Sequence, residues 1–462
     1  MSTPRIVAVA HAIAVLHSTA AACAEAQTLT YSTNGDTALA ALIEEAVERN
    51  PQLRAARLEW VAAEARIPQA SVLPNPTVSF TQHVLGPQTR VGPQFSNISL
   101  SQSMPWFGTL ADRAAMAESE SAIRGESYQA LRAEIVRRVK LAWYDLIYLD
   151  RALRVTGEEE ELLRHYESLA RARYSQGSGQ LQEAVKLQAE ITRVLNRRQE
   201  LLQQRTDTEA LLNHLTARQI GAAIAPVLDV GYRPQDPIDA ETLQEIGLAV
   251  RPEIAAARMG VERSRHAVSL ANRRSRPGLT VGIAWGAVLP RRDDPGLALP
   301  PAGNGRDHFS LTLGASIPFS RTANRAAVEE ASAKLAAAEE TYRDLTAGAA
   351  MGVRTAAFRL ETVARQLDLF ERALIPQAEH ALRTTEEAYS TGVTGVVELL
   401  DSERLLLDVR LGFARLQSDY MKASAEMERA TGSPFPTSAG NDGTSAGGPT
   451  FLVDPGSKEV GS

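Results

Sequence analysis

Apolar residues recur every three or four positions through most of this chain, which is the spacing of amphipathic helices. The pattern predicts a short helix over 37–71 that kinks near Pro68, and a much longer helix over 109–174 that contains no proline. A second long helix is predicted over 322–389, with Pro376 as its one sharp interruption. Roughly 65 helical residues at 1.5 Å each reach about 100 Å. Helices this long predict coiled-coil packing into a stiff rod or tube.

Four short segments instead alternate apolar residues with small or polar ones, which is the pattern of strands. Their apolar members are Val78, Phe80, Val84, Ile98, Leu100 and Met104 in the first half, and Leu279, Val281, Ile283, Trp285, Phe309, Leu311, Leu313 and Ile317 in the second. A half-buried sheet on a soluble core is one reading, but the polar face is uncharged and the flanking helices are too long for a compact domain. Segments of about 10 residues with one apolar face suit a wall between lipid and water. Four strands cannot close a barrel, and open edges are forbidden in lipid, so closure requires several protomers.

The first half of the chain recurs in the second, in the same order. Residues 50–58 correspond to 251–259, 103–107 to 316–320, and 174–177 to 389–392. Each copy predicts a helix, two strands, a very long helix, a tight turn and a final helix. The predicted domains are a signal peptide at 1–26, a first repeat at 27–220, a connector at 221–238, a second repeat at 239–432 and a disordered tail at 433–462.

The front of the chain has the layout of a secretory signal, with Arg5 before an apolar stretch over 6–16 and small residues over 18–26. Cys23 is the only cysteine, so the monomer can form no intramolecular disulfide. Two fates are open to it: lipidation as the first residue of the mature chain, or removal by cleavage after Ala24 or Ala26. No later segment offers about 20 consecutive apolar residues, so no transmembrane helix is predicted.

Charge and motif content argue against nucleic-acid binding and catalysis. The net charge of -6 comes from interspersed acids and bases, which give no basic field for a polyanion. The sequence contains no paired-histidine metal motif, glycine-rich phosphate loop or nucleophile elbow, so we predict no enzyme, cofactor or metal site. The acidic run at 158–161 fits a solvated helix face better than a metal site.

These features resemble the TolC family of outer-membrane factors over residues 37–432. The resemblance rests on the tandem plan and on the Tyr-Ser-x-Gly turns. It also rests on the stretch that begins Tyr389-Ser390-Thr391-Gly392 and ends Glu398-Leu399-Leu400-Asp401-Ser402-Glu403-Arg404. Residues 101–108 and 49–53 are similar to the branch associated with heavy-metal and drug efflux by resistance-nodulation-division pumps. The resemblance implies a mainly α protein with a small β part. Three protomers would give four strands each to a 12-stranded transmembrane β-barrel, continued by a long coiled-coil α-helical tunnel.

The resemblance also implies the function of a passive duct in the outer membrane, extending into the periplasm. A homotrimer in contact with outer-membrane lipid would receive heavy-metal ions or drugs from an inner-membrane resistance-nodulation-division transporter and a periplasmic adaptor protein. A secreted coiled-coil scaffold or adhesin is the alternative, but it does not explain the strands. A self-sufficient porin would need many more strands in one chain.

Glu398 and Asp401 are the candidate gate residues. They lie three apart at the start of the last helix, so threefold symmetry would stack them as two acidic rings. In the family the matching positions line the periplasmic mouth, although acids in a first turn also favour the helix dipole. Thr394 stands where relatives often place an arginine that ties the closed mouth. The first copy differs, with Glu183 and Lys186 at the corresponding positions.

The turns between the long helices are the predicted periplasmic tips. Their glycines are Gly177 and Gly179 in the first copy and Gly392 and Gly395 in the second. Glycine permits a tight reversal of the chain, and docking of the adaptor at these turns is a further hypothesis.

Overall fold

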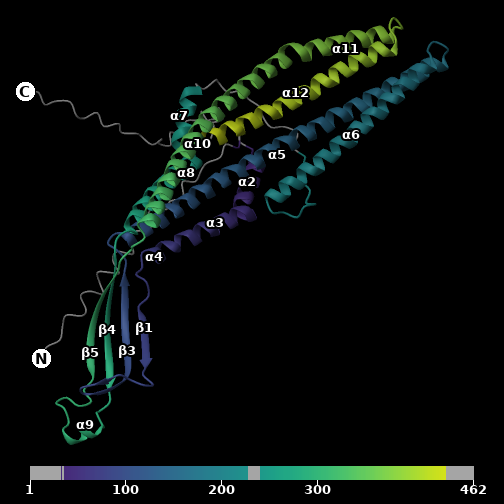
Figure 1. The fold of residues 1–462 in the computed structure, drawn as a ribbon. Helices are drawn as coiled ribbons and strands as arrows, with labels where there is room; N and C mark the ends of the chain where they lie inside the picture. Colours follow the sequence, from purple (N-terminus) through teal and green to yellow (C-terminus); the bar gives the residue numbers. More distant parts are fainter. Residues whose placement is uncertain (1–32, 34–35, 227–239, 433–462) are drawn as a thin grey trace, which may run out of the picture.

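The protein is elongated, with a β-sheet at one end and a bundle of helices that runs from it to the opposite end (Figure 1). The computed structural model describes residues 33, 36–226 and 240–432. The predicted signal peptide with Cys23, most of the connector and the predicted tail lie outside the described residues. The expected fold class, mainly α with a small β part, is confirmed, and the β part is an antiparallel sheet.

The helices of the first half end and begin at identifiable residues. They are α2 (Thr37–Arg49), α3 (Pro51–Glu64), α4 (Arg66–Ala70), α5 (Thr109–Ser175) and α6 (Leu181–Leu215). The prediction of one continuous helix over 37–71 is wrong, because the chain breaks at Asn50. The Asn50 side-chain oxygen accepts hydrogen bonds from the backbone N–H groups of Gln52 (2.9 Å) and Leu53 (3.3 Å), so it caps α3. Pro51 also disfavours a helical conformation at Asn50.

The helices of the second half follow a similar plan, with an additional short helix, α9, between the two strands of this half. They are α7 (Ala240–Val250), α8 (Pro252–Arg273), the short α9 (Asp294–Ala298), α10 (Arg321–Leu369), the π-helix η1 (Phe370–Leu374), α11 (Ile375–Ser390) and α12 (Val396–Thr431). The interruption expected at Pro376 takes the form of η1, which directly precedes α11. A proline lacks the N–H for the bond to the fourth residue before it, and the wider π turn accommodates that loss.

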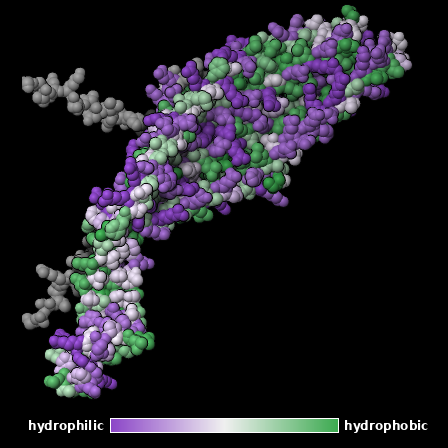
Figure 2. Space-filling model, in the orientation of Figure 1, coloured by the Kyte–Doolittle hydropathy of each residue, from purple (hydrophilic) through white to green (hydrophobic). Residues whose placement is uncertain are grey.

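The sheet joins the two halves of the chain. Its strands are β1 (Thr77–Gln82), β2 (Gln88–Thr89), β3 (Gly92–Met104), β4 (Gly278–Val288) and β5 (His308–Ser316). The antiparallel order is β1-β3-β4-β5, so β1 and β5 are the edges, and β2 pairs separately with β3. The register places Leu100 opposite Ile283 and Ile283 opposite Leu311, which aligns apolar side chains across one face. Figure 2 shows this end as paler and greener than the largely hydrophilic helices.

Among the described residues, no helix is both long enough and apolar enough to cross a membrane.

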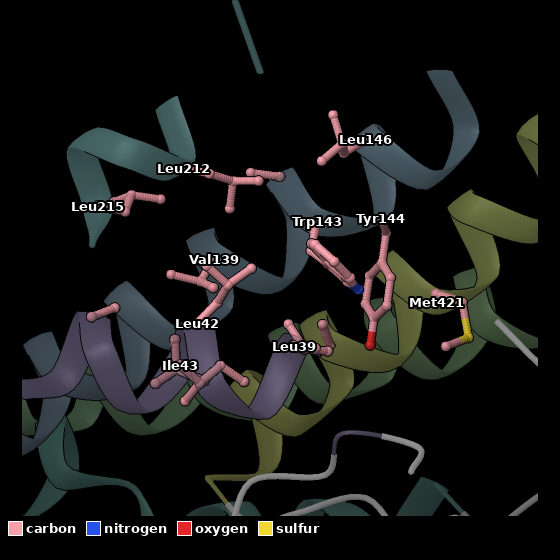
Figure 3. Packing of buried hydrophobic residues seen from close by; sticks show 14 of the residues in the cluster. Leu39, Leu42, Ile43, Val139, Trp143, Tyr144, Leu146, Leu212, Leu215 and Met421 are labelled. Carbon is pink, nitrogen blue, oxygen red and sulfur yellow. The ribbon is translucent and has the colours of Figure 1, made fainter. Parts of the chain in front are cut away.

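The main hydrophobic core lies where the short helix α2 packs on the long ones. Leu39, Leu42 and Ile43 of α2 meet Val139 and Trp143 of α5, with α6 and α12 beside them (Figure 3). The Trp143 indole N–H donates a 2.7 Å hydrogen bond to Asp36, whose other carboxylate oxygen caps α2. This core holds helices from both halves of the chain at mid-length.

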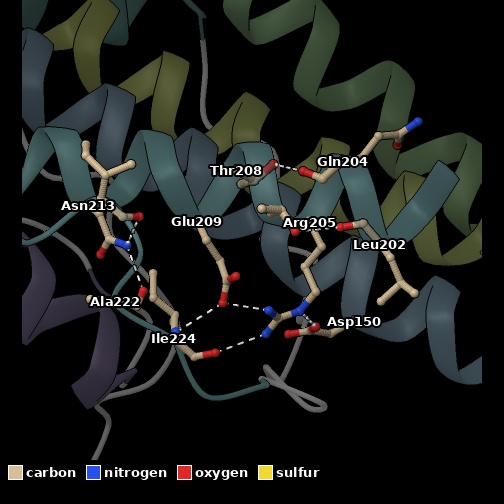
Figure 4. A network of polar contacts seen from close by, with 11 residues as sticks. Asp150, Leu202, Gln204, Arg205, Thr208, Glu209, Asn213, Ala222 and Ile224 are labelled. Carbon is tan, nitrogen blue, oxygen red and sulfur yellow. Dashed lines mark hydrogen bonds and ion pairs between the residues drawn. The ribbon is translucent and has the colours of Figure 1, made fainter. Parts of the chain in front are cut away.

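A polar network fixes the end of α6 near this core. The Arg205 guanidinium contacts the Asp150 carboxylate of α5 and the Glu209 carboxylate, and it donates to the Ile224 carbonyl oxygen (3.0 Å) (Figure 4). Glu209 in turn accepts a hydrogen bond from the Ile224 backbone N–H (3.1 Å). The network ties the segment after α6 back onto the helix.

Candidate functional site

The two helical hairpins α5–α6 and α11–α12 end in tight turns at the end of the molecule opposite the sheet (Figure 1). Gly177 has a φ of +74° and Gly392 a φ of +79°, a backbone conformation that favours glycine. A Cβ at Gly179 would lie 3.0 Å from the Arg173 Cβ, and one at Gly395 would lie 3.3 Å from a Glu398 carboxylate oxygen. All four predicted turn glycines therefore lie at these two reversals.

Glu398 and Asp401 lie in the first two turns of α12, and both are exposed. The Asp401 carboxylate is 3.5 Å from an Arg404 guanidinium nitrogen, yet its side chain is 67% exposed. Thr394, in the turn before the helix, is half-buried, and its backbone N–H donates to the Ala388 carbonyl oxygen (3.3 Å). The two carboxylates can thus face solvent, or a lumen formed by other copies of the chain.

Arg173 connects the two hairpin tips. Its guanidinium donates a 2.9 Å hydrogen bond to the Tyr389 carbonyl oxygen and lies 5.1 Å from the centre of the Tyr389 ring. The Tyr389 hydroxyl in turn lies 3.4 Å from the Glu183 carboxylate of α6. Burial and the nearby Glu183 charge raise the pKa of the Tyr389 hydroxyl, so it remains a hydrogen-bond donor. Sequence reasoning missed Arg173, because its partner is 216 residues away.

The acidic run at 158–161 is not a uniformly solvated face, so that part of the prediction is wrong. Glu159 points inward and is 4% exposed, whereas Glu158 and Glu161 are exposed. Glu403 of α12 is also 4% exposed, and sequence reasoning did not single it out. Burial, followed by the Glu403 charge, raises the pKa of Glu159 to about 8. Burial, followed by the Glu386 charge, raises the pKa of Glu403 to about 7.

A signal for these inward carboxylates was present in the sequence. Glu159 belongs to the buried α5 stripe Ala152, Thr156, Glu159, Leu163, Tyr166 and Ala170, whose spacing alternates between four and three. Glu403 occupies the same kind of position between Leu399 and Leu406 in α12. A coiled-coil seam with this spacing faces its partner helix, so an acid on the seam is enclosed.

The polar groups at the hairpin tips include contacts that join one helix to another. Within 36–226 and 240–432, no cluster of three or more His, Cys, Asp or Glu side chains could hold a metal ion. Glu398 and Asp401 at the hairpin tips are exposed, and the contacts of Arg173 and Tyr389 connect one helix to another. A long helical shaft that ends in an open-edged sheet with an apolar face defines the class of membrane-inserted conduits.

Comparison with known proteins identifies the family. The family described as outer membrane efflux protein matches residues 42–218 and 244–433. The chain therefore belongs to this family, the TolC-type efflux channels, and it is an outer-membrane channel and not an enzyme. Channels of this family function as trimers in efflux pumps.

Individual relatives are distant but cover most of the chain. It is 26% identical over 343 residues to the pyoverdine export outer membrane protein OpmQ of Pseudomonas putida, covering 73% of this chain and 70% of OpmQ. It is 21% identical over 404 residues to the outer membrane protein TolC of Vibrio cholerae, covering 85% of this chain and 90% of that TolC.

Solved structures with the same fold include several outer-membrane channels. The Campylobacter jejuni channel CmeC superposes with a TM-score of 0.73 at 17% identity, over 89% of this chain and 90% of CmeC. The Vibrio cholerae protein VceC superposes with a TM-score of 0.72 at 19% identity, over 88% of this chain and 100% of VceC. CusC superposes with a TM-score of 0.71 at 17% identity, over 86% of this chain and 93% of CusC. Because these scores are nearly equal, they do not distinguish the heavy-metal branch, which stays a prediction.

Proposed function

We propose that three copies of this chain form one continuous duct, in which the four main strands of each copy contribute to a 12-stranded barrel in the outer membrane. The observation that supports this most is the sheet, whose edges β1 and β5 are unpaired among the described residues. Its apolar side chains are exposed, including Phe80 (64%), Leu311 (68%) and Leu313 (76%). Open edges are not tolerated in lipid, and pairing between copies would remove them.

The helical part supports the same assembly. Met351 and Phe358 of α10 are 69% and 66% exposed, and Gly348 on the same helix has open space where a Cβ would lie. Exposed apolar side chains at a seven-residue spacing suit a neighbouring helix. We propose that α10 packs against another protomer, so that the helices continue the barrel as a tunnel extending into the periplasm.

The proposed partners are those of a tripartite pump: a periplasmic adaptor protein and an inner-membrane resistance-nodulation-division transporter. We propose that the adaptor docks at the helical tips, where Gly177, Gly179, Gly392 and Gly395 form the turns. The proposed cargo is heavy-metal ions or drugs. OpmQ is named for the export of pyoverdine. We propose that the transporter, and not the duct, selects the cargo.

Conduction tests the duct directly. We expect the purified full chain to produce discrete single-channel current steps in planar bilayers. A preparation that inserts into bilayers but conducts no ions under any voltage or pH would contradict the proposal.

The gate proposal concerns the tips. Three copies would bring Glu398 and Asp401 together as two acidic rings at the mouth, which attract cations and repel anions. We expect Glu398→Gln with Asp401→Asn to raise single-channel conductance or to lower the preference for cations. Glu64→Gln, which removes an exposed acid on α3, is the matched control. Currents of unchanged size and selectivity in the double variant would refute the gate.

A further inference from the structure

Two carboxylates, Glu159 and Glu403, are enclosed between α5 and α12, and neither forms an ion pair with an arginine or lysine of the described residues. Both oxygens of Glu159 and the Oε2 atom of Glu403 are buried and accept no hydrogen bond within the described residues. An ionised carboxylate in such a place pays a large desolvation penalty unless a charge compensates it. Because the side chains are 4% exposed, no group from outside the bundle reaches them while the helices remain packed.

The charged and titratable groups that face the pair come from every helix packed around it. They are Glu190 and Arg197 of α6, Glu386 of α11, Arg404, Asp408 and Arg410 of α12, and Tyr166 of α5. Each arginine already contacts another acid: Arg404 contacts Glu190 (3.1 Å), Arg197 contacts Asp408 (3.9 Å) and Arg410 contacts Glu379 (3.4 Å). Glu386 accepts the hydrogen bond of the Tyr166 hydroxyl. A proton is therefore the cation that can neutralise the enclosed pair.

We propose that Glu159 and Glu403 are a proton-binding pair that holds the α11–α12 hairpin against α5 when protonated and loosens it when ionised. The pair adjoins the hydrophobic cluster of the tip half, which includes Leu163 of α5 and Leu399 and Leu406 of α12. Ionisation would place two like charges in this cluster, and separation of the helices would hydrate them. The π-helix η1 at the base of α11 gives the hairpin an irregular turn about which to move.

The direction of the pH effect follows from the raised pKa values. The packed hairpin binds protons more strongly than a separated one, whose carboxyls return towards the ordinary value of 4.5. The packed state is therefore most stable below that value and loses stability as pH rises, until both groups ionise at about 7 to 8. Higher pH therefore favours separation of the α11–α12 hairpin from α5. The effect of that separation on conduction rests on the proposed duct, whereas proton binding by Glu159 and Glu403 does not.

Infrared spectroscopy of the purified full-length protein tests proton binding. We expect the carbonyl absorption of protonated carboxyl groups to disappear between about pH 6 and about pH 9, far above the ordinary range for glutamate. Glu159→Gln with Glu403→Gln, in which the neutral amide replaces the protonated acid, should remove that change. Glu158→Gln, at the exposed neighbour, should retain it. A change that persists in the double variant, or carboxyls that titrate only below about pH 5, would overturn the proposal.

Single-channel recordings test the consequence separately. We expect the open probability of the wild type and of Glu158→Gln to rise several-fold over the same pH range, while the double glutamine variant stays constant. The single variants Glu159→Gln and Glu403→Gln should each show a reduced response, which covers the case in which the double variant does not fold. Absence of current in every variant would count against the duct, and the infrared result would still decide the proton pair.

Discussion

At the scale of the residue, Lys140 of α5 shows how this bundle handles an enclosed charge. Its side chain is 2% exposed, and its ammonium group contacts the Glu428 carboxylate of α12, which is itself 11% exposed. Such a pair is not strongly stabilising in net terms, because both groups lose their hydration. Removing Glu428 alone, however, leaves the buried Lys140 ammonium without this carboxylate. The contact between Lys140 and Glu428 therefore fixes the position of α5 relative to α12.

We expect Glu428→Gln to lower the free energy of unfolding by about 3–5 kcal/mol, because the Lys140 ammonium is left enclosed and unneutralised. Replacing both members, with Lys140→Met and Glu428→Leu, should recover much of that loss. Lys334→Met breaks the exposed pair with Glu330, whose side chains are 71% and 65% exposed, and it should change stability by no more than about 1 kcal/mol. Denaturant unfolding compares the variants. Equal losses in the buried and exposed cases would contradict this account.

Individual site residues were predictable to different degrees. The positions of Glu398 and Asp401 at the start of α12 follow from local sequence, because the turn and the helix start are both encoded there. The inward orientation of Glu159 depends on α12, more than 200 residues further along the chain. The acidic run suggests solvent exposure, whereas the four-and-three spacing of the α5 stripe that contains Glu159 indicates burial. The contact between Arg173 and Tyr389 could not be predicted from local sequence, because the two residues are 216 positions apart.

At the scale of the element, Asn50 controls how three helices meet. Its side-chain oxygen caps α3, and its side-chain amide donates a 2.9 Å hydrogen bond to the Leu215 carbonyl oxygen at the end of α6. The residue is 2% exposed, so neither bond is replaced by water when the side chain is removed. One side chain thus fixes the angle between α2 and α3 and anchors α6.

We expect Asn50→Ala to lower the free energy of unfolding by about 2–3 kcal/mol, through the lost cap and the unsatisfied Leu215 carbonyl. Ser320→Ala is the control, since Ser320 precedes α10 but forms no side-chain cap. Denaturant unfolding monitored by circular dichroism measures both. A loss for Asn50→Ala that is no larger than that of the control would show that the cap is unimportant.

Most elements followed from periodicity, and the errors have physical causes. The helix expected over 109–174 is observed as α5 (Thr109–Ser175). A long segment with uninterrupted helical periodicity strongly favours one continuous helix. The break at Asn50 was missed although an asparagine before a proline is a helix-start signal. Pro376 was expected to interrupt its helix, but the π form of the preceding turn depends on packing. Phe370 there lies 3.0 Å from the position of a Cβ at Gly412 of α12.

At the scale of the whole molecule, the two halves are joined side by side at β3 and β4, and each half contributes one edge strand. The helical shaft has a largely hydrophilic surface, while the exposed apolar residues of the sheet gather at one end (Figure 2). A single chain in this form exposes both a lipid-type surface and two open strand edges. Covering this surface and closing these edges therefore require assembly with other copies of the chain.

The mass of the assembly extracted from the outer membrane shows whether three copies form the duct. We expect detergent extraction of the outer-membrane fraction, followed by native mass spectrometry, to give a species of about three times the mass of the mature chain, stable at dilution because three pairs of edges are closed. A monomer in that fraction, or a particle found only in the soluble fraction, would contradict the trimeric duct.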